Sequence, residues 1–169
     1  MVRKPGSMYR KVEGQPYCRR EYMGGVPHSK IVQFNAGNLK MNFPLRLTLM
    51  VEEACQIRDS ALEASRIAAV RLLEKELPNN FKLKMLKYPN NVLREHKMAI
   101  GAGADRVSDG MRAAFGKPVS IAVRANINEK IIRLDIPTDK IELGKKALKK
   151  AASKLPSPCR IIAENLQKA

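Results

Sequence analysis

The chain has 169 residues, with 32 Lys and Arg against 16 Asp and Glu, so its formal charge is +16 and its pI is about 10.1. The length suits one domain with an extension, and a hydrophobic content of 44% is enough to bury a core. The absence of Trp and an aromatic content of 5% argue against an aromatic-lined ligand pocket. No apolar run is long enough to cross a membrane, and the first residues lack the apolar stretch of a secretory signal. We therefore expect a soluble, cytoplasmic protein.

Cysteine and histidine are too sparse for a metal site. Cys18, Cys55 and Cys159 lie far apart in the sequence and are odd in number, which argues against a disulfide scaffold and a zinc ribbon. With only His28 and His96 to add, no Cys/His cluster can be assembled. We expect reduced, mostly buried thiols, and neither a metal nor another cofactor.

The excess of positive charge lies mainly in two segments. The net charge is +6 over residues 1–40, −1 over 41–80, +7 over 81–133 and +4 over 134–169. Solubility does not require so many uncompensated cations, so the surplus indicates a polyanionic partner, most often a nucleic acid. An anionic membrane would instead require a basic amphipathic helix with large apolar anchors, which the sequence lacks.

Residues 1–44 contain four prolines and five glycines and almost no apolar periodicity, apart from a short strand expected at residues 31–34. We interpret them as a basic, irregular N-terminal extension that precedes an α+β core domain over residues 45–169. Within the core domain, alternating apolar residues predict strands at 45–51 and 81–85. Between them, helical spacing predicts a helix over 62–77, with Ser60 and Glu63 as a capping box.

The second half of the core domain begins after a long inserted loop, which the Gly- and Ala-rich residues 99–118 predict. Alternation at residues 121–125 and 132–136 around a turn at 128–130 predicts a hairpin. A helix over 140–154, capped by Thr138 or Asp139, and a short strand at 159–163 complete the order. The predicted fold is an α+β two-layer sandwich, with one mostly antiparallel sheet and two helices on one face.

Enzymatic interpretations of the loop are weak. Gly101 and Gly103 lack the third glycine of a dinucleotide-binding motif, and the glycines at 110 and 116 are wrongly spaced for a Walker loop. Asp105 and Asp109 have no accompanying nucleophile or electrophilic stabiliser. We expect no catalysis; the alternatives are an RNA-modifying or RNA-cleaving enzyme that uses Asp105 and Asp109, and a free RNA chaperone.

RNA binding is predicted where cations accompany aromatic or small residues, because such mixtures bind phosphates and bases. The candidate RNA-binding residues outside the loop are Arg3, Lys4, Tyr9, Arg10, Lys11, Tyr17, Arg19, Arg20, Tyr22, Lys82, Lys84, Arg94, Lys97 and Arg124. In the loop they are Gly101, Gly103, Arg106, Arg112, Phe115 and Lys117, where small residues allow close approach and Arg offers paired donors to phosphate. The lysine-rich face of the last helix is as compatible with simple solvent exposure as with contact to phosphates.

The loop also carries a family signature. The signature consists of Gly103-Ala104-Asp105-Arg106, then Asp109-Gly110-Met111-Arg112, then Ala114-Phe115-Gly116-Lys117-Pro118. It resembles that of the large-subunit ribosomal protein family called number sixteen in bacteria and "ten e" in archaea and eukaryotes. The resemblance extends over residues 3–135 and includes Arg3-Lys4-Pro5, Pro16-Tyr17 and Val92-Leu93-Arg94-Glu95. The form of the loop resembles the archaeal and eukaryotic branch, and the short C-terminal region favours the archaeal one.

The resemblance implies a hammerhead-type α+β sandwich at the base of the central protuberance of the ribosome. It implies large-subunit rRNA, tRNA and neighbouring ribosomal proteins as partners, without a membrane or a small-molecule substrate. The candidate residues outside the loop would then bind rRNA. The loop at residues 101–117 would point toward the tRNA acceptor arms, near the aminoacyl site and the peptidyl transferase region.

Overall fold

The computed structural model of the chain describes residues 5–12, 14, 18–98 and 110–166. Its elements follow in the order α1 (Ser7–Arg10), η1 (Arg20–Tyr22), β1 (Asn35–Gly37), β2 (Leu45–Val51), β3 (Cys55–Arg58), α2 (Asp59–Glu76), β4 (Lys82–Met85), β5 (Asn91–Glu95), η2 (Gly110–Ala113), β6 (Lys117–Ala125), β7 (Lys130–Ile136), η3 (Thr138–Lys140), α3 (Ile141–Ala152) and β8 (Cys159–Asn165). The strands predicted at 45–51, 81–85 and 159–163 and both long helices are confirmed, with small shifts at their ends. Strand β6 begins at Lys117, so the last two residues of the expected loop belong to it.

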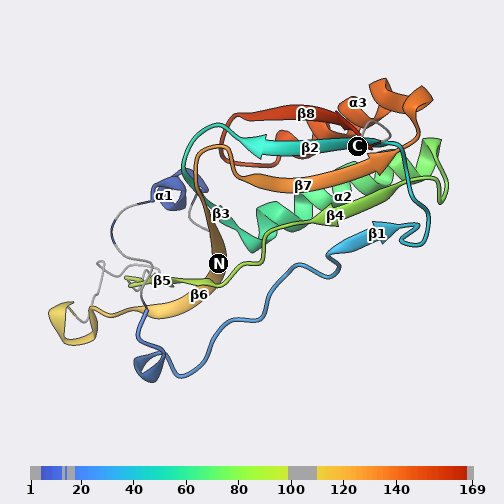
Figure 1. Cartoon of the computed structure of the whole chain (residues 1–169). Helices are drawn as coiled ribbons and strands as arrows, with labels where there is room; N and C mark the ends of the chain where they lie inside the picture. Colours follow the sequence, from blue (N-terminus) through green and yellow to red (C-terminus); the bar gives the residue numbers. More distant parts are fainter. Residues whose placement is uncertain (1–4, 13, 15–17, 99–109, 167–169) are drawn as a thin grey trace, which may run out of the picture.

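The described strands form two sheets, in which every pairing is antiparallel. One sheet has the order β1-β4-β7-β2-β8 and the other has the order β3-β6-β5. Helices α2 and α3 lie together on one side of the five-stranded sheet (Figure 1). The α+β class and the antiparallel pairing are thus confirmed, whereas the expectation of a single sheet was wrong.

The predicted hairpin was also wrong, because β6 and β7 lie in different sheets. Each already has a partner on both edges: β6 lies between β3 and β5, and β7 lies between β4 and β2. The turn that joins them binds the end of β2 instead. The amide of Asn128 donates to the carbonyl of Val51 over 2.9 Å, and the amide of Val51 donates to the carbonyl of Glu129 over 3.2 Å.

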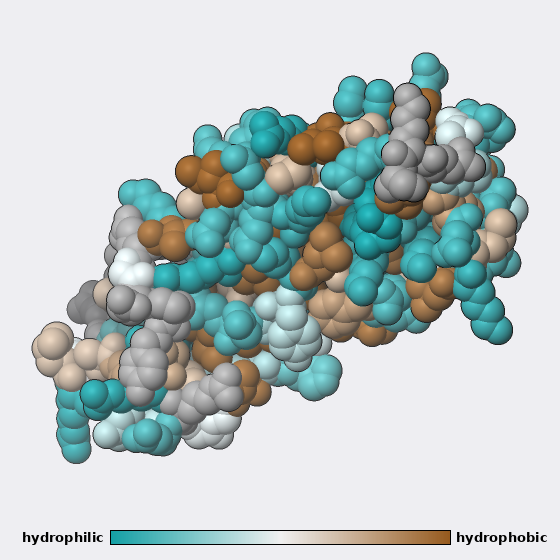
Figure 2. All heavy atoms as spheres, viewed as in Figure 1, coloured by the Kyte–Doolittle hydropathy of each residue, from teal (hydrophilic) through white to brown (hydrophobic). Residues whose placement is uncertain are grey.

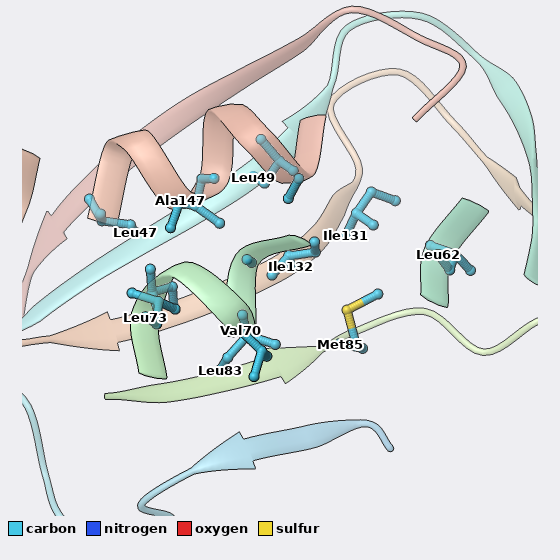
Figure 3. Close-up of a cluster of buried hydrophobic side chains, with 14 of the residues drawn as sticks. Leu47, Leu49, Leu62, Val70, Leu73, Leu83, Met85, Ile131, Ile132 and Ala147 are labelled. Atoms are coloured by element: carbon cyan, nitrogen blue, oxygen red, sulfur yellow. The ribbon is translucent and has the colours of Figure 1, made fainter. Parts of the chain in front are cut away.

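The main core fills the space between the five-stranded sheet and its two helices. Leu47, Leu49 and Ile132 point from the sheet toward Leu73 of α2 and Ala147 of α3 (Figure 3), and all five are fully buried. Each large aliphatic side chain buried in this way contributes about 1.5–3 kcal/mol to folding. This face of the sheet is thereby closed by the helices.

Helix α3 begins without the side-chain cap that the sequence pattern predicts. A Cβ at Gly144 would lie 2.4 Å from Cδ1 of Ile136, so α3 can approach the sheet closely only with a glycine there. Thr138 and Asp139 do not cap α3, because they form η3 and the residue before the helix is Lys140. Tertiary contacts with the sheet, rather than a side-chain cap, fix where this helix begins.

The capping box predicted at Ser60 and Glu63 was wrong. Helix α2 begins at Asp59, whose Oδ1 accepts a hydrogen bond from the amide of Ser60 over 2.7 Å. Glu63 instead pairs with Arg66, one turn further along, and its Oε2 accepts a hydrogen bond from the amide of Val32 over 3.4 Å. Asp59 is a buried residue of the first turn, and no side chain caps the start of α2.

Part of the N-terminal segment joins the five-stranded sheet, but not at the expected place. The strand predicted at residues 31–34 lies instead at 35–37, where β1 pairs with β4. The reason is that amides before it already bind α2: Lys30 donates to Asp59 Oδ2 over 3.2 Å, and Val32 donates to Glu63. The chain pairs with β4 only after it has left the helix.

Candidate nucleic-acid interface

Side chains from three distant segments meet where the inserted loop rejoins the core. Phe115 lies beside Tyr22 of η1, with the ring centroids 6.0 Å apart at an interplanar angle of 73°. On Phe115 also lies the guanidinium of Arg94 from β5, whose Cζ is 3.9 Å from the ring centroid. Arg94 Nη1 donates a hydrogen bond to the carbonyl of Phe115 over 2.7 Å. We call Tyr22, Arg94 and Phe115 the loop-base clamp.

A second, small apolar cluster lies under the clamp. It contains Met23, Val92 and Ile121, with Cys18 and Phe115 packed against it. The thiol of Cys18 lies 3.2 Å from Sδ of Met23. This cluster holds the turn around η1 against the three-stranded sheet, so the basic N-terminal segment and the end of the basic loop meet at one end of the molecule.

The chain crosses β5 very closely at Gly116. This residue has φ +75°, and a Cβ on it would lie 2.8 Å from the carbonyl carbon of Glu95. Glu95 is itself buried, and its Oε2 lies 3.6 Å from Nζ of Lys97. The geometry requires glycine here, and it fixes the direction from which the loop joins β6.

The residues on both sides of this crossing face solvent. Met111 is 90% exposed and Arg112 is exposed before it, and Lys117 is exposed directly after it. Figure 1 shows η2, which contains Arg112, at the opposite end of the molecule from α3. Two predicted loop cations therefore flank the clamp on an open surface.

Helix α1 packs beside β3. The Arg58 guanidinium lies 5.3 Å from the centroid of the Tyr9 ring, and Gln56 Nε2 donates to the carbonyl of Tyr9 over 3.1 Å. Arg10 forms an ion pair with Glu53. The Tyr9 hydroxyl is buried without a hydrogen-bond partner among the described residues. Tyr9 and Arg10 thus anchor α1 to the core, while Lys11 and Arg19 are exposed.

The remaining predicted RNA-binding residues divide into two places. Arg124 Nη1 donates to the carbonyl of Gly14 over 2.9 Å, which ties the N-terminal segment to β6. Lys82 and Lys84 lie on β4 in the five-stranded sheet, away from the clamp. Outside the described residues lie Arg3, Lys4, Tyr17, Gly101, Gly103 and Arg106, together with Asp105 and Asp109 of the enzymatic alternative, and the side chain of Arg20.

The sequence profile of the family described as "Ribosomal protein L16p/L10e" matches residues 12–162. The chain belongs to this family. A protein of Methanoculleus marisnigri is 52% identical over 97% of both chains, and one of Methanospirillum hungatei is 51% identical over 100% of both. One of Archaeoglobus fulgidus is 47% identical over 97% of this chain and 94% of its own. All three are named "Large ribosomal subunit protein uL16".

Membership of the L16p/L10e family confirms the predicted resemblance, and the archaeal relatives agree with the predicted branch. It is a family of structural ribosomal proteins, so the chain is not an enzyme. Among the described residues, no three His, Cys, Asp or Glu side chains are grouped to hold a metal ion, and no helix is long and apolar enough to cross a membrane.

Three arginines of this ribosomal protein were not predicted as site residues. Arg58 covers Tyr9, and Arg46 and Arg133 lie on the five-stranded sheet, where both bind Asp135. A usable signal was present for the last two, since each is the polar member of an alternating strand pattern. What the pattern cannot show is that β2 and β7 are neighbours.

The three cysteines of the chain are free thiols. Burial, followed by the nearby Cys55 and Glu52, raises the pKa of Cys159 to about 11. Burial also raises the pKa of Cys55, against the opposing effect of a hydrogen bond with Ser157. Both thiols are therefore protonated at neutral pH and are poor nucleophiles.

Proposed function

We propose that the chain is a structural constituent of the large ribosomal subunit that binds rRNA through the loop-base clamp and the cations around it. The observation that carries the proposal is the contact of Tyr22 and Arg94 with Phe115, because it places two strongly basic segments side by side. In this function the partners are large-subunit rRNA and neighbouring ribosomal proteins, and the protein works in cytoplasmic ribosomes.

The physical basis is neutralisation of phosphates around a rigid apolar support. Arg112 and Lys117 are exposed beside the clamp, and residues 81–133 carry a net charge of +7. Each phosphate that these cations neutralise releases condensed counterions, which supplies most of the affinity at low salt. Residues 1–44 serve as an RNA-binding extension, and residues 45–169 are the core domain that holds it.

A finer part of the proposal is that the loop at residues 101–117 helps to position tRNA near the aminoacyl site and the peptidyl transferase region. It is supported by the loop signature, and by the place of η2 and the exposed Met111 at one end of the molecule. A segment whose sequence combines small residues and cations suits contact with a second RNA that binds and dissociates.

The rRNA part is tested with Arg112→Gln/Lys117→Gln. We expect this variant to bind archaeal large-subunit rRNA at least about tenfold more weakly than the native chain in a filter-binding titration. The matched control is Lys145→Gln/Lys149→Gln, which removes two exposed cations from α3. An equal loss in both variants would mean that only total charge matters, and it would overturn the assignment of the site.

The tRNA part is tested with Arg112→Cys in a Cys18→Ser background, with an iron chelate attached to the new thiol within reconstituted large subunits. Cys55 and Cys159 remain, because their raised pKa values make them slow to react. Radical cleavage in the acceptor arm of bound tRNA is the expected result. Cleavage confined to rRNA would remove tRNA positioning from the proposal and leave rRNA binding in place.

A further inference from the structure

The five-stranded sheet has one face that no described helix covers, and this face is strongly basic. Strand pairing aligns its outward-pointing residues in rows across β4, β7, β2 and β8. The charged members are the cations Lys82, Lys84, Arg46, Lys130, Arg133 and Arg160 and the carboxylates of Asp135 and Glu164. Hydrophilic side chains cover much of the surface over this sheet (Figure 2). We call it the open sheet face.

A fixed pair of arginines lies in the middle of the open sheet face. Asp135 on β7 accepts hydrogen bonds from Nε of Arg46, over 2.9 Å, and from Nε and Nη2 of Arg133, over 3.1 and 3.0 Å. The Asp135 side chain is only 6% exposed. One buried carboxylate thus orients two guanidinium groups from neighbouring strands.

Both arginines have N–H donors that do not bind Asp135. Arg46 uses only Nε for Asp135, and among the described residues nothing accepts a hydrogen bond from its Nη1 or Nη2. Arg133 likewise has Nη1 available within the described part of the chain. The Arg46 side chain is 22% exposed and that of Arg133 is 32% exposed, so both reach solvent. The Nη pair of Arg46 is the edge that binds a phosphate with two parallel hydrogen bonds.

The same residues line a hollow. It has a volume of about 380 Å³, and Arg46, Lys82, Arg133 and Asp135 form its charged part. Its other walls come from residues 41–44 and from Leu166, whose amide donates to the carbonyl of Pro44 over 2.8 Å. Three cations against one carboxylate leave the hollow positive, and a carboxylate already bound to two arginines cannot repel an anion strongly.

We propose that this hollow binds a backbone phosphate of rRNA, with Arg46 as the bidentate donor, Arg133 and Lys82 as supporting cations and Asp135 as the residue that positions both arginines. The site rests on the proposed function, because its ligand is the same RNA. It adds a second contact surface, separate from the loop-base clamp. The protein then binds rRNA through two surfaces rather than through its basic segments alone.

The charges around the hollow favour a polymer over a single small anion. Lys84 lies two residues from Lys82 on β4, about 6.6 Å away, and Lys130 and Arg160 extend the basic surface toward the other end of the sheet. A strip of separated cations matches a chain of regularly spaced phosphates. We therefore commit to an RNA strand, with an acidic protein segment as an outcome of the test.

The test compares rRNA binding by full-length variants over a range of KCl concentrations. Arg46→Gln and Arg133→Gln should each weaken binding to archaeal large-subunit rRNA roughly tenfold, and each should lower the slope of log affinity against log salt by about one. Single substitutions leave Asp135 one arginine partner, which protects the fold. The matched control Lys149→Gln, on α3, should weaken binding less than twofold.

The double variant Arg46→Lys/Arg133→Lys separates geometry from charge. It keeps both cations, so it should retain the salt slope but bind several-fold more weakly, because lysine cannot form the paired contact. Equal affinity of this variant and the native chain would overturn the bidentate role of Arg46. A competition assay distinguishes RNA from an acidic protein segment. Poly-uridylate should displace rRNA at a lower concentration of charge than poly-glutamate does. If poly-glutamate displaces rRNA at the same concentration of charge, the choice of RNA is overturned.

Failure of this site can be told apart from failure of the proposed function. If Arg112→Gln/Lys117→Gln loses affinity while Arg46→Gln and Arg133→Gln bind like the native chain, the hollow is not a phosphate site and the proposed function stands. If the native chain does not bind large-subunit rRNA, both are overturned. Circular dichroism spectra that match the native one confirm that each variant is folded.

Discussion

The guanidinium of Arg94 lies 3.9 Å from the centroid of the Phe115 ring and donates a hydrogen bond to the carbonyl of the same residue. One side chain thus holds both the ring and the backbone of the residue that precedes the close crossing at Gly116. Tyr22 touches the ring as well. The structural result is that β5, the N-terminal segment and the end of the loop are fixed to each other at one point.

Arg94→Ala should therefore loosen the N-terminal segment. We expect a loss of about 1 kcal/mol in the free energy of unfolding, the usual size for an exposed cation–π contact plus a hydrogen bond. Amide hydrogen exchange should become faster around η1, while residues 62–73 of α2 keep their protection. Exchange around η1 that does not change in this variant would show that the small cluster of Met23, Val92 and Ile121 holds the segment alone.

Gly116→Ala should destabilise the protein more than Gly110→Ala. Both glycines have positive φ, but a Cβ at Gly110 meets nothing within 4 Å, whereas one at Gly116 lies 2.8 Å from the backbone of Glu95. The left-handed conformation alone costs roughly 1 kcal/mol, and the contact adds to it. Urea unfolding of both variants measures the difference. Equal losses would mean that β5 can move away from the loop at no cost.

Stability should fall as the pH rises from about 9 to about 11. The pKa of Cys159 is raised from 9.0 to about 11 in the folded chain, so the unfolded chain loses its proton first and alkaline pH favours unfolding. Below pH 9 the thiol is protonated in both states and its contribution to stability is fully present. Cys159→Ala should flatten the decline in urea unfolding between pH 8 and pH 11. A decline as steep as that of the native chain would contradict this origin.

Glu63 should stabilise the protein above its unfolded pKa and lose this effect in acid. The hydrogen bonds and charge of Arg66, helped by the Val32 amide and opposed by burial, lower the pKa of Glu63 below 4.5. The difference in stability between the native chain and Glu63→Gln should be about 1 kcal/mol at pH 7. It should shrink as the pH falls from 4.5 through the lowered pKa. Glu76→Gln, exposed at the end of the same helix, is the control and should show little difference at any pH.

Local patterns in the sequence predicted the parts of the fold that carry their own periodicity. Leu45, Leu47 and Leu49 alternate with Arg46 and Thr48, because the leucines pack against the helices while the residues between them lie on the face that no described helix covers. Strands β3 and β5, unlike the equally short β4, escaped prediction because buried residues follow one another in them, at residues 55–57 and 92–93. Such short segments show too little alternation to be told from a loop.

Long-range pairing was not predictable from the same patterns. The alternation in β6 and β7 around a short turn favours a hairpin, and only the occupied edges of both strands exclude it. For the same reason, Arg46 and Arg133 could be recognised as outward-facing residues but not as neighbours. The loop-base clamp joins residues from three separate segments, so composition indicated its RNA-binding chemistry but could not bring Tyr22, Arg94 and Phe115 together.

The most direct test of rRNA binding by two basic surfaces is the salt dependence of binding to archaeal large-subunit rRNA. If at least about six phosphates are neutralised, affinity should fall on the order of 10³-fold between 50 and 200 mM KCl. Losing cations at either the clamp or the open sheet face should make that dependence shallower. An affinity that stays constant over this range would contradict the account.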